Sequence, residues 1–402
     1  MNKLRIVLSS AILLVNAHVC ALEGISDREL SEIAGQAFIT VDTSSYSDPT
    51  YGNFEFSKIN LGVDIEIQAN TDSVKLGTFD RAYGSEGTAP LIDVEYVDSK
   101  RVPTYRDANN DGIVDVNDSD IHLDNLALGR VDDYDSDNPV IVPFRIHNPY
   151  IELAYAVDTN NVRRIAGVRI GAESGYGNLS ADLISLTGKF DGLVIGNLSD
   201  AQKFACDTNA TDGQCGVLTL AVAAFGDPII YSELGLLDGA TGDPIPPASD
   251  DGALYIKRAQ WAGIRNGDYF TTQGASDAVK WAIESLAVSD KCSALGVQTC
   301  FNIGIYDSIY VGVDDADSTD DNFEDNGARG VFVSLQSEVV PWEDLSGLPD
   351  ATRVYAEHGA YLNSAKYMAG DGNERYPLVL ELFQGLSGTQ RVATCVGRTK
   401  GC

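Results

Sequence analysis

The sequence predicts a mostly β protein, with an elongated β-solenoid-like or antiparallel sandwich architecture and one or two short helices. The first observation is that apolar and polar residues alternate over several long stretches, as in strands with one buried face. The second is that glycines separate shorter apolar runs, as turns separate strands. The third is a composition rich in Gly and Tyr with only two Met, which favours extended β structure over helices.

Length and charge narrow the possible functions. The chain has 402 residues, enough for one large domain or two ordinary ones, and 44% apolar residues, enough to bury a core. Its formal net charge is −31, from 59 acidic residues against 28 Lys and Arg. Such a surface repels nucleic acids and anionic membranes and attracts cations. We therefore expect no nucleic-acid partner, and we expect metal cations among its ligands.

The first segment, residues 1–21, has the pattern of a secretory signal peptide. Lys3 and Arg5 supply the positive start, and Ile6–Val15 is an apolar run too short to span a bilayer. Val19–Ala21 then offers a cleavage site. We expect an exported protein of the periplasm, the outer surface or the extracellular medium, with no transmembrane segment in the mature chain.

Residues 22–36 predict a short capping helix. Ser26 and Glu29 form a capping box, and Gly35 is placed to end the helix. After a signal peptide, the pattern S-D-x-E-L-S-E-x-x-G-Q resembles a group of uncharacterised exported proteins of Gram-negative bacteria, some described as components of pilus systems. The resemblance is confined to this segment and implies export and a surface location, while the function stays open.

The strongest strand predictions lie in the first half of the chain. Ile59–Ala69, Ile92–Tyr96 and Ile151–Val157 alternate apolar and polar residues. Ile165–Asn197 shows short β-like runs separated by glycines. Stacked rungs of a solenoid and an antiparallel sandwich with Gly-rich turns give nearly the same pattern, so both architectures remain open.

The second half of the chain is more mixed. Val217–Phe225 is nearly all apolar and predicts a buried strand, whereas Ser276–Leu286 has the apolar stripe of a helix. The Pro-rich stretch Pro244–Asp251 is the best candidate for a boundary. We therefore expect a main β domain over residues 37–245, which contains the calcium loop described next, and a mixed, mainly β region over residues 246–402.

Asp107–Asp118, read as D-A-N-N-D-G-I-V-D-V-N-D, has the spacing of a calcium-binding loop. Calcium takes six to eight oxygen ligands, and positions 1, 3, 5, 7, 9 and 12 of such a loop point at one centre. The predicted Ca²⁺ ligands are Asp107, Asn109, Asp111, Ile113 through its backbone carbonyl, Asp115 and Asp118. The pattern resembles dockerin-type, EF-hand-like loops, except that position 12 is Asp instead of Glu. The alternative is a solvated acidic turn.

Two further acidic runs are weaker candidates. Asp133, Asp135 and Asp137 recur at alternate positions, which is half of a calcium loop and leaves a second ion site open. Asp314–Asp325 has the charge but lacks an internal glycine, so we expect a solvated loop there.

Cysteine spacing predicts disulfides. Apart from Cys20 in the signal peptide, the cysteines form three close pairs. Six cysteines allow fifteen connectivities, and local pairing is the simplest. An exported protein meets an oxidising compartment, and the chain has no C-x-x-C to suggest zinc. The expected disulfides are Cys206–Cys215, Cys292–Cys300 and Cys395–Cys402.

A catalytic centre is not evident in the sequence. His122, His147 and His358 are each more typical of structural histidines, and the chain contains none of the usual hydrolase or nucleotide-binding motifs. We therefore expect an exported, calcium-binding, non-catalytic surface or pilus-associated structural or adhesive protein, whose partner is another surface protein or a glycan. The alternative is a secreted polysaccharide-acting enzyme that uses a carboxylate pair.

Overall fold

The computed structural model describes most of the chain. The described residues are 39–78, 92–97, 100–105, 119–208, 214–237, 256–294, 297–313, 326–350 and 352–396. The predicted signal peptide, the predicted helix at 22–36, the calcium loop Asp107–Asp118 and the acidic run Asp314–Asp325 lie outside these residues. The mostly β fold is confirmed, because strands make up most of the described elements and form one large, mainly antiparallel sheet.

One strand organises the sheet. This strand, β11 (Arg163–Asn197), is 35 residues long and changes neighbours along its length. Residues 167–171 lie between β10 and β21, residues 179–180 between β7 and β19, and residues 192–195 between β12 and β27. The bounds of these neighbours are β7 (Ile121–Leu128), β10 (Phe144–Val157), β12 (Ile229–Leu237), β19 (Ser308–Val311), β21 (Phe332–Gln336) and β27 (Leu378–Glu381).

The first part of β11 belongs to a layer with the strand order β1–β2–β10–β11–β21–β24, in which every neighbouring pair is antiparallel. The additional strands are β1 (Ile39–Asp48), β2 (Gly52–Leu61) and β24 (Gly359–Ser364). One face of this layer buries Phe54, Phe56 and Trp342 in a common core. Trp342 comes from the hairpin of β22 (Val340–Glu343) and β23 (Arg353–Ala356), which packs against this face.

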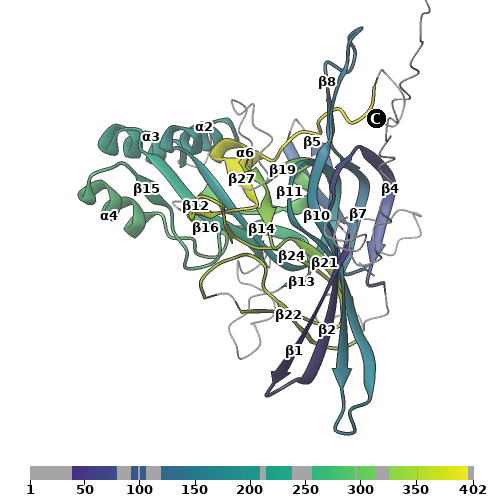
Figure 1. Ribbon diagram of the computed structural model, residues 1–402. Helices are drawn as coiled ribbons and strands as arrows, with labels where there is room; N and C mark the ends of the chain where they lie inside the picture. Colours follow the sequence, from purple (N-terminus) through teal and green to yellow (C-terminus); the bar gives the residue numbers. More distant parts are fainter. Residues whose placement is uncertain are drawn as a thin grey trace, which may run out of the picture.

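The later part of β11 belongs to a second layer, which carries the helices. Strands β4 (Ala69–Leu76), β14 (Trp261–Gly263), β15 (Thr271–Gln273) and β18 (Cys300–Asn302) extend it. The helices are α2 (Leu198–Thr208), α3 (Gln214–Phe225), α4 (Asp277–Leu286) and α6 (Leu382–Ser387). They pack on the largest hydrophobic core, and α2, α3 and α4 gather at one end of the molecule in Figure 1. A smaller cluster that includes Ile121 and Ala360 joins residues of both layers.

The remaining described elements are short. They are β3 (Asp64–Ile67), β5 (Ile92–Val97), β6 (Lys100–Tyr105), β8 (Arg130–Asp132), β9 (Val140–Val142), β13 (Ile256–Ala259), β16 (Ser293–Ala294), β17 (Val297–Gln298), η1 (Ile303–Ile305), β20 (Ala328–Arg329), β25 (Tyr367–Met368) and β26 (Glu374–Arg375). Two of them, β13 and β20, also pair with β11. Strands from both sides of the predicted boundary near residue 245 pair with β11.

Three predictions about individual elements were wrong. The glycines of Ile165–Asn197 do not separate short strands, because all of these residues belong to β11. Gly188 instead permits close approach: a Cβ there would lie 1.9 Å from the carbonyl oxygen of Leu362 on β24. The predicted strand Ile59–Ala69 is divided among β2, β3 and β4.

The third error concerns Val217–Phe225, which is part of helix α3 and not a buried strand. A short apolar run has no periodicity that separates a buried strand from a buried helix. The described residues therefore contain four α-helices where one or two were predicted, and the predicted helix Ser276–Leu286 is confirmed as α4. Between the two predicted architectures, the antiparallel pairing fits the sandwich, because solenoid rungs would pair in parallel.

Two of the predicted disulfides, Cys206–Cys215 and Cys292–Cys300, are confirmed. Cys395 is also disulfide-bonded, and its expected partner Cys402 lies outside the described residues. Each confirmed bridge closes a short local loop, so the disulfides fix loops and leave the order of the strands to hydrophobic packing.

Candidate functional site

The predicted calcium loop lies outside the described residues, and the structure describes the chain again from Ser119 onward. Ser119 and Asp120 are fully buried at the start of β7. One Asp120 oxygen accepts a hydrogen bond from Nε of the buried Arg258 at 3.0 Å, and the other accepts one from the backbone N–H of Ala360 at 2.9 Å. The two residues that directly follow the predicted loop in the sequence are therefore buried beside the core that joins the two layers.

The second acidic run lies at the turn between β8 and β9. Asp133 has a left-handed backbone with φ of 50° and accepts a hydrogen bond from the backbone of Ser136. In the part of the chain that the structure describes, no three His, Cys, Asp or Glu side chains are grouped as a metal site would require.

Two of the histidines contact carboxylates in the way expected of structural residues. Nε2 of the buried His122 lies 3.1 Å from Oδ1 of Asp124, and Nδ1 of His147 lies 2.6 Å from Oδ1 of Asp64. A neighbouring carboxylate holds an imidazole ring in place on a strand without any catalytic role. His358 lies between β23 and β24.

A cluster of charged side chains surrounds Asp191 and Glu233 on β11 and β12. Arg265 Nη2 lies 3.1 Å from Asp191 Oδ1, and Lys366 Nζ lies 3.5 Å from Glu233 Oε1. Tyr376 donates its hydroxyl to Glu233, and burial together with this hydrogen bond raises the pKa of Tyr376 above its ordinary value. Since both carboxylates are engaged by cations and donors, the cluster is better described as an ion-pair network than as a carboxylate dyad for hydrolysis.

An apolar pocket with a volume of about 280 Å³ lies between α2, α3 and α4. It is the candidate functional site. Its described lining is Leu198, Ala201, Val217, Leu218, Leu220, Ala221, Ala224, Phe225, Ile230, Phe270, Ile283, Leu286, Ala287, Ala294, Val297, Thr299 and Leu386. Among these residues only Thr299 has a polar side chain, and its hydroxyl is 2.9 Å from that of Ser289.

Local sequence explains why these helices enclose a pocket. Helix α3 reads Q-C-G-V-L-T-L-A-V-A-A-F and has no charged residue, so every side of it is apolar or neutral. Helix α4 is amphipathic and buries Ile283 toward the pocket. A helix that is apolar on every side is normally buried. Helix α3 nevertheless lies at the surface of the second layer, with Val217 and Leu220 exposed.

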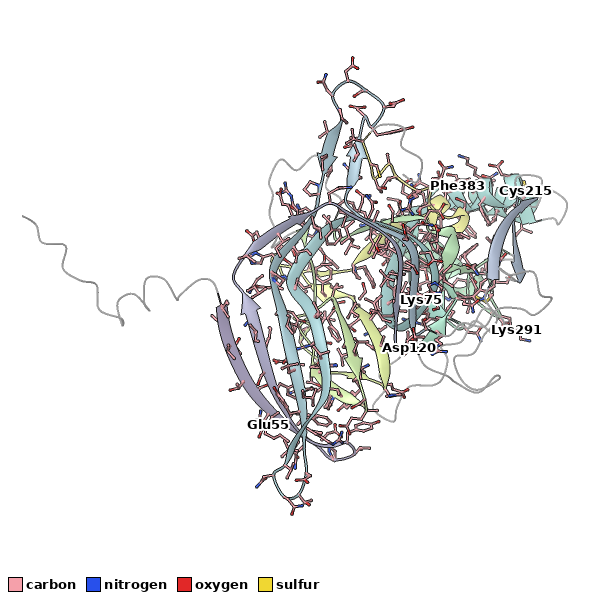
Figure 2. The ribbon with its side chains drawn as sticks, turned by 90° about the vertical axis from the view of Figure 1, so that its right-hand side faces the viewer. Glu55, Lys75, Asp120, Cys215, Lys291 and Phe383 are labelled. Carbon is pink, nitrogen blue, oxygen red and sulfur yellow. A yellow bond between two sulfur atoms is a disulfide. The ribbon has the colours of Figure 1, made fainter. Side chains whose placement is uncertain are left out.

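Both confirmed disulfides frame this pocket. Cys206–Cys215 joins the end of α2 to the start of α3, with the two Cα atoms 4.6 Å apart. Cys292–Cys300 closes the loop that supplies Ala294, Val297 and Thr299 to the lining. Figure 2 shows Cys215 and Lys291 on the side of the molecule that carries the helices. The walls are therefore held by covalent links at two points.

The mouth of the pocket is also apolar. Val217, Leu220 and Leu286, which we call the apolar rim, line the pocket and are exposed to solvent; Leu220 is 71% exposed. An exposed apolar patch around a cavity is typical of an interaction site. Sequence reasoning missed the site because it assigned α3 to a buried strand. The run of apolar residues directly after a cysteine pair was the available signal.

The described lining suits binding and not acid–base chemistry. It offers no carboxylate, imidazole or amine that would exchange a proton with a substrate. An engineered apolar cavity of about 150 Å³ accepts benzene. The larger volume here accepts an apolar group with the bulk of one or two side chains.

The fold and the site together define a mostly β protein with an apolar pocket at its helical end. In comparisons with protein-family models, curated proteins and solved structures, nothing matches this chain. None of the helices in the described ranges has the length and apolar character needed to cross a membrane.

Proposed function

We propose that the protein is an exported, calcium-binding, non-catalytic surface or pilus-associated protein that binds another surface protein through its apolar pocket. The observation that carries the proposal is the pocket itself, whose apolar lining continues outward into the exposed rim of Val217, Leu220 and Leu286. Tight protein interfaces commonly seat one or two anchor side chains in such a pocket and bury a surrounding apolar surface.

The lining argues against a glycan as the ligand of this pocket. Sugar hydroxyls need hydrogen-bonding partners, and the only hydroxyl in the described lining, that of Thr299, already faces Ser289. A free small lipid is also a poorer fit, because small-molecule sites usually place a few polar groups to orient the ligand. An aliphatic or aromatic side chain on a protein partner needs neither.

Calcium contributes rigidity in this proposal. Before export, calcium is scarce and the acidic loop Asp107–Asp118 repels itself; outside, calcium near about 10⁻³ M fills a site of the weak extracellular kind. Binding to the folded state alone then stabilises the fold by mass action. Because Ser119 and Asp120 follow the loop directly and are buried, an ordered loop is linked to the core.

The pocket is tested first with an uncharged naphthylamine fluorophore, since the charge of −31 repels anionic probes. Ala221 lines the pocket, so Ala221→Trp fills it and abolishes the fluorescence increase. Ala223 lies on the same helix, is exposed and does not line the pocket, so Ala223→Trp is the matched control that keeps binding.

The partner is tested with a photoreactive benzophenone side chain at position 220, which lies on the rim. Irradiation with an outer-surface fraction of the source cells should link the chain to one protein. Ala221→Trp or excess fluorophore must prevent this link, and Ala223→Trp must not. Crosslinking to lipid or glycan alone, or to proteins in a way that Ala221→Trp does not change, contradicts the proposal.

A further inference from the structure

A second apolar surface lies at the other end of the molecule. It is the face of β1, β2, β10, β11 and β21 that points away from the core of Phe54, Phe56 and Trp342, and we call it the open face. Side chains alternate between the two faces of a strand, so the strand registers define its members. One row crosses the five strands through the paired residues Val41, Ile59, Ile151, Ile170 and Val333.

This row passes from a covered position into solvent. At its inner end, Val333 packs against the cluster that joins the two layers. Its next residue, Ile170, is already 59% exposed, Ile151 is 42% exposed, Ile59 is half-buried, and Val41 on the edge strand β1 is 62% exposed. Ile39, Ile165 and Leu335 on the same face are exposed as well. Around this row the open face therefore presents apolar side chains like those of a sandwich interior, although Val333 at its inner end is covered; toward the β1–β2 turn the face becomes polar with Ser45, Ser47 and Asn53.

Charge distinguishes the open face from the rest of the surface. The charged side chains among its alternating residues are Glu55, Arg145 and Arg163. Glu55 and Arg163 neutralise each other at 3.0 Å, with Arg163 also over the ring of Tyr155, and Arg145 lies 3.3 Å from Glu66 on β3. Figure 2 places Glu55 near the tip of the long hairpins, far from the helical end. In a chain with a formal charge of −31, copies repel each other over most of their surface, and the open face is a region where they meet without that repulsion.

The size of the open face matches a protein interface. The strands range from 5 residues in β21 to 14 in β10. With about ten residues per strand on average, about 3.4 Å per residue and about 4.8 Å between strands, the five strands cover roughly 800 Å², including the covered inner end. A standard interface buries about 800 Å² on each partner. Two sheets that pack face to face do so at a separation of about 10 Å with their side chains interdigitated.

We infer that two copies of this chain pack their open faces together in a two-fold symmetric dimer. Each copy supplies the cover that the other lacks, so Val41, Ile151 and Ile170 become interior residues of a sandwich formed between subunits. A two-fold interface uses the same patch on both partners, and an apolar, internally neutral face is complementary to itself. The pocket between α2, α3 and α4 lies in the other layer and stays available to a different partner.

Sedimentation velocity of the mature chain with calcium present tests the dimer. Concentrations from about 10⁻⁷ to about 10⁻⁴ M cover the weak end of the range for interfaces of this size. Ile170→Glu places two like charges in the interface and should weaken self-association at least about 100-fold, which corresponds to about 2.8 kcal/mol. Val41→Glu, on the outermost strand β1, repeats the test at a position where the fold tolerates charge more readily.

The control is Val379→Glu, because Val379 is exposed on β27 in the other layer and should leave self-association unchanged. Circular dichroism and melting confirm that each variant is folded. A wild-type chain that stays monomeric throughout the concentration range overturns the inference. So does association that neither Ile170→Glu nor Val41→Glu weakens. Fluorophore binding by Ala221→Trp tests only the pocket, and self-association tests only the dimer, so either proposal can be refuted without the other.

Discussion

Replacing Glu152 with Gln should destabilise the protein by about 3 kcal/mol, because it leaves the buried guanidinium of Arg169 without its counter-ion. Arg169 is fully buried and donates from Nε to Glu152, which is 3% exposed, while Nη1 donates to the carbonyl oxygen of Glu343 at 2.8 Å. Arginine does not lose its proton in proteins, so the charge remains when its counter-ion is removed. Removing one partner of a buried ion pair typically costs about 3–5 kcal/mol.

The lower end of that range applies here because aromatic rings partly replace the lost counter-ion. The guanidinium carbon of Arg169 lies 5.4 Å from the ring centre of Tyr150, 5.0 Å from that of Phe332 and 5.1 Å from that of Trp342. Each such contact contributes about 0.5–2 kcal/mol to holding a cation. Burial also raises the pKa of Tyr150 to about 12, with Arg169 acting against this rise, so the phenol stays neutral beside the pair.

Urea unfolding at fixed calcium concentration and fixed protein concentration measures this effect. Arg169→Met and Glu152→Leu are also made singly and together. The double variant should recover most of the stability that each of these two single variants loses, since a buried pair can be replaced by apolar residues of similar volume. Glu338→Gln is the matched control: it removes the same charge from the exposed pair with Arg164, at 2.7 Å, and should cost at most about 1 kcal/mol. If Glu152→Gln costs no more than Glu338→Gln, or if the two single effects simply add in the double variant, the reasoning about the buried cation is refuted.

Three further predictions concern calcium, the disulfides and pH. Added calcium should raise the melting temperature, and Asp111→Ala should abolish that rise. A free calcium concentration of ten times Kd stabilises the folded state by about 1.4 kcal/mol. Identical melting curves with calcium and with chelator would contradict the predicted site. Reduction of Cys206–Cys215 should weaken fluorophore binding more than it changes the far-ultraviolet circular dichroism, because the bridge holds α2 against α3; unchanged binding after complete reduction would show that the pocket walls do not depend on it. Although burial raises the pKa of Asp48, hydrogen bonds from the N–H groups of Tyr51 and Thr50 and from the hydroxyl of Tyr355 lower it below its ordinary value. The stability from Asp48 is therefore present above pH values near 3.8 and is lost as pH falls below them, so Asp48→Asn should flatten the acid limb of a melting-temperature profile, and an unaltered limb counts against this role.

Local chemistry made several features predictable from the sequence. Alternation over Ile151–Val157 indicated a strand because a side chain on a strand faces the opposite side from its neighbour, whatever the rest of the fold does. The apolar residues of Ser276–Leu286 recur about every 3.6 residues, which places them on one side of a helix, so this segment indicated a helix. The bridges Cys206–Cys215 and Cys292–Cys300 span nine and eight residues, so proximity along the chain was sufficient to predict them.

The candidate site was not predictable in this way. Its lining comes from α2, α3, α4, β12, α6, Phe270 just before β15 and the loop closed by Cys292–Cys300, which approach only through long-range packing. The apolar run at Val217–Phe225 was compatible with either a strand or a helix. Its helical form depends on contacts distant in sequence: the bridge from Cys215 to Cys206 on α2 and the hydrophobic core on which α3 packs. A pocket is a property of how elements leave space between them, and no local pattern records that space.

By itself the sequence determined the β character of the chain, its acidic surface, the local disulfides and the helix α4, since each depends on residues close together along the chain. The tertiary structure alone decided that Ile165–Asn197 forms one continuous strand, and that its neighbours come from both halves of the chain. It also decided that the row from Val333 to Val41 is covered at one end and exposed at the other. The pairing of strands from distant segments determines which apolar residues are buried, because burial depends on neighbours in space and not on neighbours in sequence.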